Sequence, residues 1–207
     1  MTAALDVDGL AALLPGWLPE QRWFAGKGRP VAGCRVVWAQ PLAEGDPALD
    51  DVLVRVDYAD GGTDHYQLLV GRRPEPGERL EHAVVGPLGD EIAYDAVHDH
   101  ELTGRLLELL DRGDAVGRVR FETTGARLDT SASSLVLGSE QSNTSVVYGD
   151  AYIYKLFRRI ALGHNPDLEV TRALALAGSP HVPPPLAWAE GELDGSPVTL
   201  GLLQPFL

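Results

Sequence analysis

One lysine and one glutamate in the second half of the chain have the residue types and spacing needed to bind a phosphorylated ligand. Lys155 lies in an apolar and aromatic run, and Glu169 follows it by 14 residues. An ammonium group can balance the charge of a nucleotide's phosphates, and a carboxylate can hold that ammonium in place by ion pairing. The pair therefore predicts a phosphate site with Lys155 and Glu169 as its catalytic residues.

A polar loop before the lysine could supply neutral hydrogen-bond donors to the same ligand. Its side chains are amides and hydroxyls, without a basic cluster. The donors are Gln141, Ser142, Asn143, Thr144 and Ser145. We expect these residues to bind the phosphates of the cofactor together with Lys155.

Local patterns predict the elements that position these residues. Strand-like runs at 134–137 and 144–148 flank the loop, Gly149-Asp150 indicates a hairpin turn, and residues 151–157 form a third strand. Asn165 is a favourable N-cap for a helix that carries the glutamate in its first turns. Strand, loop, strand, lysine strand and helix follow one another in the order found in a kinase small lobe.

Plainer interpretations are open for these residues. An isolated strand lysine is more often an edge residue with its amine in water, and the polar loop could be an ordinary hairpin. The ordered combination of Lys155 with Glu169 favours the phosphate site. A second polar group, from His98 to Glu101, suggests a metal site. Because His98 and His100 are two residues apart and would not share a helix face, we assign no metal ligand.

Composition limits the classes of function. The 207 residues suffice for one large domain or two small ones. A net charge of −13 argues against nucleic acid and anionic membranes as partners. Cys34 is the only cysteine, so an internal disulfide is impossible, and we expect a cytoplasmic protein. No apolar run approaches the ~18 residues of a membrane span.

Turn signals and composition divide the chain into three parts. The clearest hairpin pairs 51–58 with 63–70 around Ala59-Asp60-Gly61-Gly62. A polar, proline-rich stretch at 72–78 follows and marks a boundary. The predicted parts are 1–80, an intermediate segment 81–131 with one helix, and 132–207 with five antiparallel strands and one helix. We therefore expect an α+β fold.

Two motif blocks carry a family resemblance. The first runs from Trp17 to Lys27, and the second combines Glu140–Ser145, Lys155–Arg159 and Asn165–Glu169. Together they resemble the actinobacterial maltokinases, which are ATP-dependent sugar kinases of the aminoglycoside-phosphotransferase and protein-kinase-like superfamily. The resemblance extends from about Leu14 to Leu207. Tyr154 departs from the pattern, where we expect an aliphatic residue, but this should leave Lys155 unaffected.

The resemblance implies a more detailed architecture. Residues 1–80 would form the maltokinase-type N-terminal cap, a helix plus an antiparallel sheet. Residues 132–207 would form a protein-kinase-like N-lobe with one αC-type helix, ending at the hinge. Gln204, Phe206 and Leu207 would then lie against the adenine of ATP. The C-lobe would be absent from these residues, so we expect a piece of an enzyme that is inactive alone.

The resemblance also implies an activity, the transfer of a phosphoryl group from ATP to maltose to give maltose 1-phosphate. Magnesium ligands would belong to the absent C-lobe, and trehalose synthase is an implied partner. Three alternatives remain open: a related sugar kinase such as a glucosamine kinase, a non-catalytic module with kinase-like topology that binds a protein partner, and a wholly structural α+β domain. The presence of both Lys155 and Glu169 favours a kinase.

Overall fold

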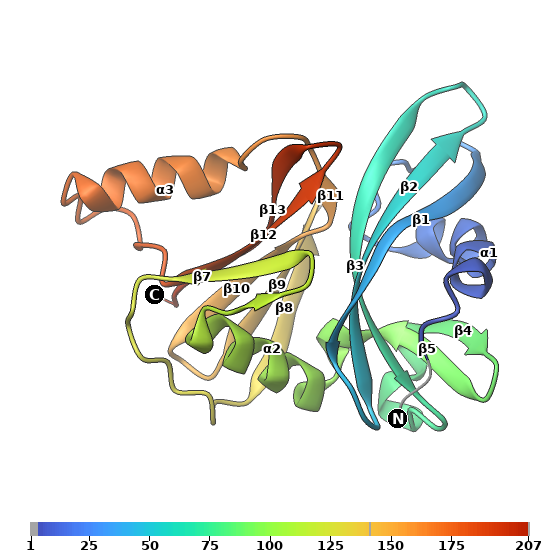
Figure 1. Ribbon diagram of the computed structural model, residues 1–207, viewed down its shortest axis with the longest axis horizontal. Coiled ribbons are helices and arrows are strands. Elements are labelled where there is room, and N and C mark those ends of the chain that lie inside the picture. The colour runs from blue at the N-terminus through green and yellow to red at the C-terminus, as the bar shows by residue number, and fades with distance from the viewer. Residues whose placement is uncertain (1–3, 141, 207) are drawn as a thin grey trace.

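The computed structural model describes residues 4–140 and 142–206, which form two antiparallel sheets and three α-helices (Figure 1). The cap sheet has the strand order β1-β2-β3-β5-β4, with β11 paired to β3. The lobe sheet has the order β6-β7-β12-β13-β10-β9-β8. The α+β fold expected from the sequence is confirmed.

The strands of the cap sheet are β1 (Val31–Ala43), β2 (Ala48–Tyr58), β3 (Thr63–Arg73), β4 (Val84–Leu88), β5 (Glu91–Asp95) and β11 (Arg159–Ile160). Those of the lobe sheet are β6 (Ala115–Val116), β7 (Val119–Thr123), β8 (Ser134–Glu140), β9 (Asn143–Tyr148), β10 (Tyr152–Phe157), β12 (Ala187–Leu193) and β13 (Ser196–Pro205). The α-helices are α1 (Val7–Trp17), α2 (His100–Arg112) and α3 (Pro166–Leu176). Short 3-10 turns are η1 (Leu18–Glu20), η2 (Glu78–Ala83) and η3 (Ala96–His98).

The cap sheet is buried on both faces, because successive residues of a strand point to opposite sides. In β2, Val52, Val54 and Val56 belong to the apolar cluster that includes residues of α1. Leu49 and Leu53 belong to the cluster shared with the lobe sheet. The predicted hairpin of β2 with β3 is confirmed.

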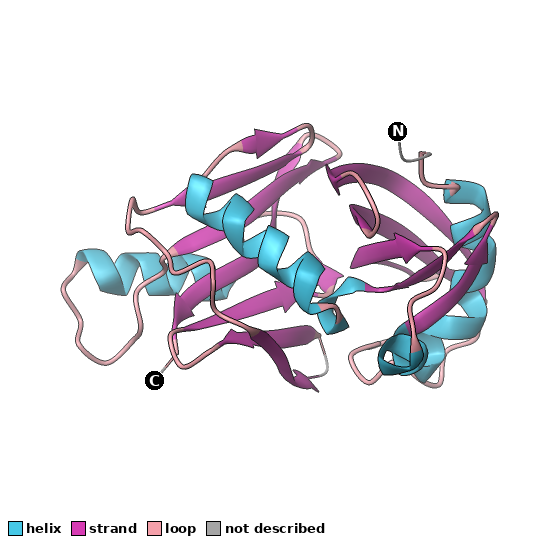
Figure 2. Ribbon diagram, turned by 90° about the horizontal axis from the view of Figure 1, so that it is seen from below, coloured by secondary structure: helices cyan, strands magenta, loops and turns pink. Residues whose placement is uncertain are grey.

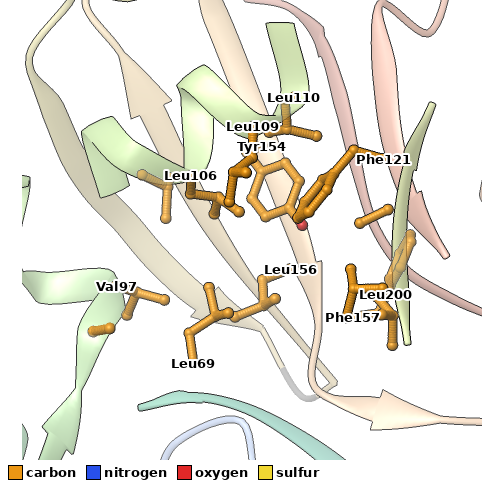
Figure 3. Packing of buried hydrophobic residues seen from close by; sticks show 14 of the residues in the cluster. Leu69, Val97, Leu106, Leu109, Leu110, Phe121, Tyr154, Leu156, Phe157 and Leu200 are labelled. Carbon is orange, nitrogen blue, oxygen red and sulfur yellow. The ribbon is translucent and has the colours of Figure 1, made fainter. Parts of the chain in front are cut away.

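The second apolar cluster joins the lobe sheet to α2 and to the cap. Figure 2 shows α2 lying across the lobe sheet. Leucines of α2 such as Leu106 and Leu109 face Tyr154 of β10, while Leu69 of β3 approaches Leu156 from the cap side (Figure 3). The two sheets therefore share one continuous core, and residues of β10 contribute to it directly.

The intermediate segment 81–131 does not form a layer of its own. Its first strands, β4 and β5, join the cap sheet beside β3, and its last strands, β6 and β7, join the lobe sheet beside β12. The range expected for the cap, 1–80, therefore leaves out β4 and β5, as well as β11 from further along the chain. Five strands from 132–207 lie in the lobe sheet, as expected, and β6 and β7 extend it to seven.

Helix α3 begins as the sequence predicts. The side chain of Asn165 caps it by accepting a hydrogen bond from the backbone N–H of Asp167. Only Leu168 of this helix is buried, and Figure 1 shows α3 (orange) reaching outward from the lobe sheet. No helix within the described ranges has the length and apolar composition needed to cross a bilayer.

Candidate phosphate-binding site

Lys155 lies in the middle of the lobe sheet, on β10, which is the third strand along the chain after residue 132. It is paired with Ser145 of β9 on one side and with Leu202 of β13 on the other. Residues directly opposite one another in an antiparallel pair share a face, so the Ser145 hydroxyl and the Lys155 ammonium project from the same side of the sheet. The side chain of Lys155 is 35% exposed. In a chain with lysine only at positions 27 and 155, this one stands on an accessible sheet face.

The partner of the ammonium is Asp167 and not Glu169. Lys155 Nζ lies 2.8 Å from Asp167 Oδ2. Among the described residues Glu169 forms no ion pair, and its side chain is exposed. Residues two positions apart on an α-helix, as Asp167 and Glu169 are, lie about 200° apart around its axis. The two carboxylates therefore cannot both face one strand. Because Leu168 packs inward, Asp167 is directed to Lys155 and Glu169 to solvent.

The strand β13 fixes the start of α3 and so the position of Asp167. The backbone N–H of Asn165 donates to Thr199 Oγ1 at 2.9 Å, and the N–H of Gly163 donates to the carbonyl of Pro197 at 2.8 Å. Asp167 lies in the first turn of the helix, where the helix dipole favours a carboxylate. The ion pair is thus held by the same strand that borders Lys155.

Two of the predicted loop donors serve other purposes. Thr144 is buried, and its Oγ1 accepts a hydrogen bond from Arg158 Nε at 2.8 Å. Its side chain lies on the sheet face opposite to Ser145, since neighbours on a strand alternate. The carbonyl of Ser142 accepts hydrogen bonds from the backbone N–H groups of Arg158 and Arg159. Asn143 begins β9 opposite Phe157 and is half-buried, on the same face as Ser145.

The residues expected near the hinge are partly placed. Gln204 of β13 pairs with Ile153, and its Nε2 donates to the carbonyl of Pro183 at 2.6 Å. Phe206 is half-buried, and its backbone N–H donates to the carbonyl of Ala151 at 2.9 Å. The other two predicted contacts, Gln141 and Leu207, lie outside the described residues.

A hollow of about 340 Å³ opens beside the lysine. Its lining includes Lys155, Asp167 and Gln204, together with Val170 and Thr171 from the same side of α3. Larger hollows exist elsewhere on the surface, so size does not single this one out. Its chemistry distinguishes it, because its lining combines an ammonium, a carboxylate and an amide with apolar side chains.

The sequence prediction missed an apolar row next to the lysine. Register places Leu135 of β8, Val147 of β9 and Ile153 of β10 side by side, with Gln204 of β13 at the end of the row. This row lies two residues, or roughly 7 Å, from the row that holds Lys155 and Ser145. Leu135 is 61% exposed. Each strand was visible in the sequence, but the row depends on cross-strand register, which no local pattern gives.

Tyr154, the departure from the expected pattern, lies on the far side of the sheet from Lys155. It is fully buried against α2 and the glycine at position 201, and burial raises the pKa of its hydroxyl well above the usual range. The side chain therefore stays neutral and fills the core. The histidines that suggested a metal site are engaged elsewhere: His98 contacts His82, and His100 contacts Arg79 and Ser134.

Residues 17–99 match the maltokinase N-terminal cap domain family. This range contains the whole of η1 through β5, which are the cap strands β1–β5 and the turns between them. The resemblance of the opening segment Trp17–Lys27 to that family is therefore confirmed. The match also continues past residue 80, in agreement with the strands β4 and β5 of the cap sheet.

The fold of the chain is similar to solved structures of glucosamine kinases. One, in complex with glucosamine, ADP and inorganic phosphate, is 18% identical, with a TM-score of 0.65. The match covers 100% of this chain and 42% of that one. A second glucosamine kinase structure, crystal form A, is 18% identical with a TM-score of 0.59 and the same coverage. Crystal form B is 19% identical with a TM-score of 0.53, covering 97% of this chain and 39% of that one.

These comparisons agree with the two-sheet architecture. At such identities the likeness to the glucosamine kinases concerns the fold, and the chain spans less than half of their length. The family match concerns the cap sheet and the segment that leads into it. Residues 17–99 of this chain thus match the maltokinase N-terminal cap domain family, and the chain shares its fold with part of the glucosamine kinases.

Proposed function

We propose that the chain is the cap and small lobe of an ATP-dependent sugar kinase. The observation that carries the proposal is the pair of adjacent rows on one face of the lobe sheet. One row is apolar and contains Val147 and Ile153, and the next presents Ser145 and Lys155. A nucleotide needs both kinds of surface: a flat apolar surface for its base and a cation with neutral donors for its phosphates.

In this arrangement Lys155 neutralises and orients the phosphates. An ammonium carries three N–H donors, and in the structure one carboxylate, that of Asp167, pairs with it. The remaining donors can bind phosphate oxygens while Asp167 fixes the direction of the lysine side chain. The ammonium contributes to catalysis because it stabilises the charge that develops on the transferred phosphoryl group. Asp167 thus takes the role that the sequence assigned to Glu169.

The base would lie against the apolar row and near Gln204 and Phe206. Exposure of Leu135 at the edge of this row supports the assignment, since an exposed large apolar side chain on a sheet face gains from being covered. Magnesium would accompany the triphosphate and supply further charge neutralisation when bound. We propose that its ligands and the base that accepts the sugar's proton come from a large lobe outside residues 1–207.

We propose maltose as the acceptor sugar, with maltose 1-phosphate as product. The maltokinase cap at residues 17–99 supports this choice. Glucosamine is the second candidate, and the fold shared with a kinase solved in complex with glucosamine and ADP favours it. Association with trehalose synthase is a further expectation from the maltokinase resemblance and needs its own binding experiment.

Phosphoryl transfer by the complete kinase tests the proposal. The enzyme would be incubated with magnesium ATP and either maltose or glucosamine, and the products followed by phosphorus NMR. We expect an anomeric phosphate on maltose, formed in step with ADP. Transfer to glucosamine alone would establish the second candidate. Release of inorganic phosphate or no turnover with a panel of sugars would contradict a sugar kinase.

A further inference from the structure

Arg158 directly follows the lysine strand, and its side chain is fully buried. Its guanidinium contacts three separate parts of the chain. Nη2 lies 2.6 Å from Asp95 Oδ2 at the end of β5, and Nε donates to Thr144 Oγ1 in β9 at 2.8 Å. The guanidinium carbon stands 4.6 Å from the centre of the Trp23 ring. Cap and lobe thus meet on one side chain.

The backbone of the same residue makes a second connection between cap and lobe. The N–H of Arg158 donates to the carbonyl of Ser142 at 2.8 Å, and its carbonyl accepts from the N–H of Gln67 in β3 at 2.7 Å. The next two residues form β11 and pair with β3 of the cap sheet. The chain therefore leaves the lobe sheet and enters the cap sheet at this point.

The cost of burying Arg158 indicates that its role is to fix the directions of its contacts and not to add stability. Removing a guanidinium from water is costly, and an apolar side chain of similar volume often gives equal or greater stability. Among the described residues Arg158 Nη1 has no hydrogen-bond partner, and neither does Asp95 Oδ1, so the pair is not even fully satisfied. What arginine adds is a rigid planar fork that can hold two partners at fixed directions. Those partners are Asp95 in the cap and Thr144 beside the lysine strand.

The aromatic segment at the start of the cap fits the same scheme. Trp23 is buried, packs edge-on against Trp17, and lies against Tyr66 of β3. The face of Trp23 is attractive to a cation, and Arg158 is the cation that it meets. The position of Trp23 in the cap thus helps to determine where the guanidinium of Arg158 lies.

We infer that Arg158 is the positioning residue through which the cap sets the phosphate site. It holds Ser142, just before β9, and Thr144 within β9, and it follows Lys155 by three residues, directly after the strand that carries the lysine. The inference rests on the proposed function, because the site that Arg158 positions is the one assigned to the nucleotide. In this scheme the cap acts on ATP binding without contacting ATP.

The test compares Arg158→Met with a matched loss of another buried arginine, Arg72→Met, in the complete kinase. Arg72 is 4% exposed and pairs with Asp50 and Glu91 entirely within the cap sheet. Both variants should lose stability. Only Arg158→Met should accelerate amide hydrogen exchange of Asn143, Thr144 and Ser145, to a rate about tenfold higher than in Arg72→Met. The reason is that the loss of Arg158 lets the start of β9 open locally more often. Arg158→Met should also raise the KM for ATP by a similar factor, with kcat for bound ATP changed less.

A milder variant keeps the test decisive if Arg158→Met does not fold. Thr144→Val preserves volume and removes only the hydroxyl that the guanidinium holds, leaving the pair with Asp95. It should reproduce part of the faster exchange and of the higher KM. Arg158→Lys, which keeps the charge but not the fork, should restore stability more than it restores KM. Equal exchange and equal KM in Arg158→Met and Arg72→Met, or parental values in Thr144→Val, would overturn the inference.

The exchange measurement needs no turnover. If the parent and all variants fail to bind ATP, the proposed function is wrong, whereas the comparison of amide exchange still decides whether Arg158 holds this segment to the cap.

Discussion

Two ion pairs lie three residues apart along one stretch of chain, and they differ in almost everything except length. Arg158 and Asp95 meet at 2.6 Å with side chains 0% and 4% exposed. Lys155 and Asp167 meet at 2.8 Å with side chains 35% and 48% exposed. A buried pair is costly to break because the remaining charge has no solvent, whereas an exposed pair contributes little to stability. The buried pair therefore fixes structure, and the exposed pair is free to exchange a partner for a ligand.

The comparison also separates the two regions that these pairs occupy. The junction around Arg158 draws on the cap, the lobe and the crossing strand β11. The site around Lys155 draws on the lobe sheet, on the first two turns of α3 and on residues 182–183, which follow that helix. We therefore assign assembly to the region around Arg158 and ligand binding to the region around Lys155.

The largest effect on stability should come from the carboxylate of the buried pair. Asp95→Asn leaves the Arg158 guanidinium buried without a counter-charge and should cost roughly 3–5 kcal/mol of unfolding free energy. Asp167→Asn makes the same chemical change in the exposed pair and should cost less than about 1 kcal/mol. Urea denaturation of both variants measures the difference. Similar losses would show that burial does not distinguish the two pairs.

Asp51 offers a third case, a buried carboxylate that forms no ion pair within the part of the chain that the structure describes. It accepts hydrogen bonds from Trp38 and Gln67, and burial raises its pKa from 3.8 to about 6. Because the folded-state pKa exceeds the unfolded value, this group stabilises the fold at low pH, and that contribution is lost as the pH rises from about 4 to about 6. Asp51→Asn should remove this dependence. Gln67 Oε1, which has no hydrogen-bond partner among the described residues, can accept from the new amide.

The gain from Asp51→Asn should therefore be near zero below pH 4 and reach roughly 3 kcal/mol above pH 6, the value of about two pKa units. Denaturation midpoints of the variant and the parent, measured from pH 4 to pH 7, give this difference directly. A difference that does not change with pH would mean that Asp51 titrates normally in the folded protein.

Gly201 tests how firmly β10 is held between the two pairs. It lies opposite Leu156, and a Cβ at this position would overlap the ring of Tyr154. Tyr154 is buried against α2 and has little room to move (Figure 3). Gly201→Ala should cost roughly 1–3 kcal/mol, as overpacked cores do. The control is Gly33→Ala, because a Cβ at position 33 meets no described atom within 4 Å, and its effect on stability should be near zero. Gly195→Ala in the β12–β13 turn is not a suitable control, because Gly195 has a positive φ.

The smallest effect concerns the choice between the two carboxylates of α3. Asp167→Asn should raise the KM for ATP by about fivefold, the upper end for an exposed ion pair, and Glu169→Gln by less than about twofold. Steady-state kinetics of the two variants in the complete kinase make the comparison. The reverse order would restore Glu169 as the partner of Lys155 in the working enzyme.

Much of the fold follows from local signals in the sequence. The turn at Ala59–Gly62 and the alternation on either side of it predict β2 and β3, and Asn165 predicts the start of α3. These predictions are confirmed because each depends on residues close in sequence. The face of β2 occupied by its valines is also predictable, since a strand alternates with a period of two.

The details of the site depend on contacts between distant segments. Nothing local distinguishes Thr144, which turns into the core, from Ser145, which turns toward the hollow. The adjacent arginines 158 and 159 look alike in the sequence, yet one is fully buried and the other is half exposed and paired with Asp64. Selection of Asp167 over Glu169 depends on the rotation of α3, which Leu168 sets by packing inward.

Phosphoryl transfer by Lys155→Met in the complete kinase tests the central claim most directly. Methionine keeps the apolar stem of the side chain and removes only the charge, so the variant should melt close to the parent. We expect its rate of sugar phosphorylation to fall at least about a hundredfold, the size of losing one well-placed electrostatic contact in a transition state. A folded variant that retains more than about half of the parental rate would contradict the assignment of Lys155 to the phosphate site, because losing such a contact slows a reaction far more than twofold.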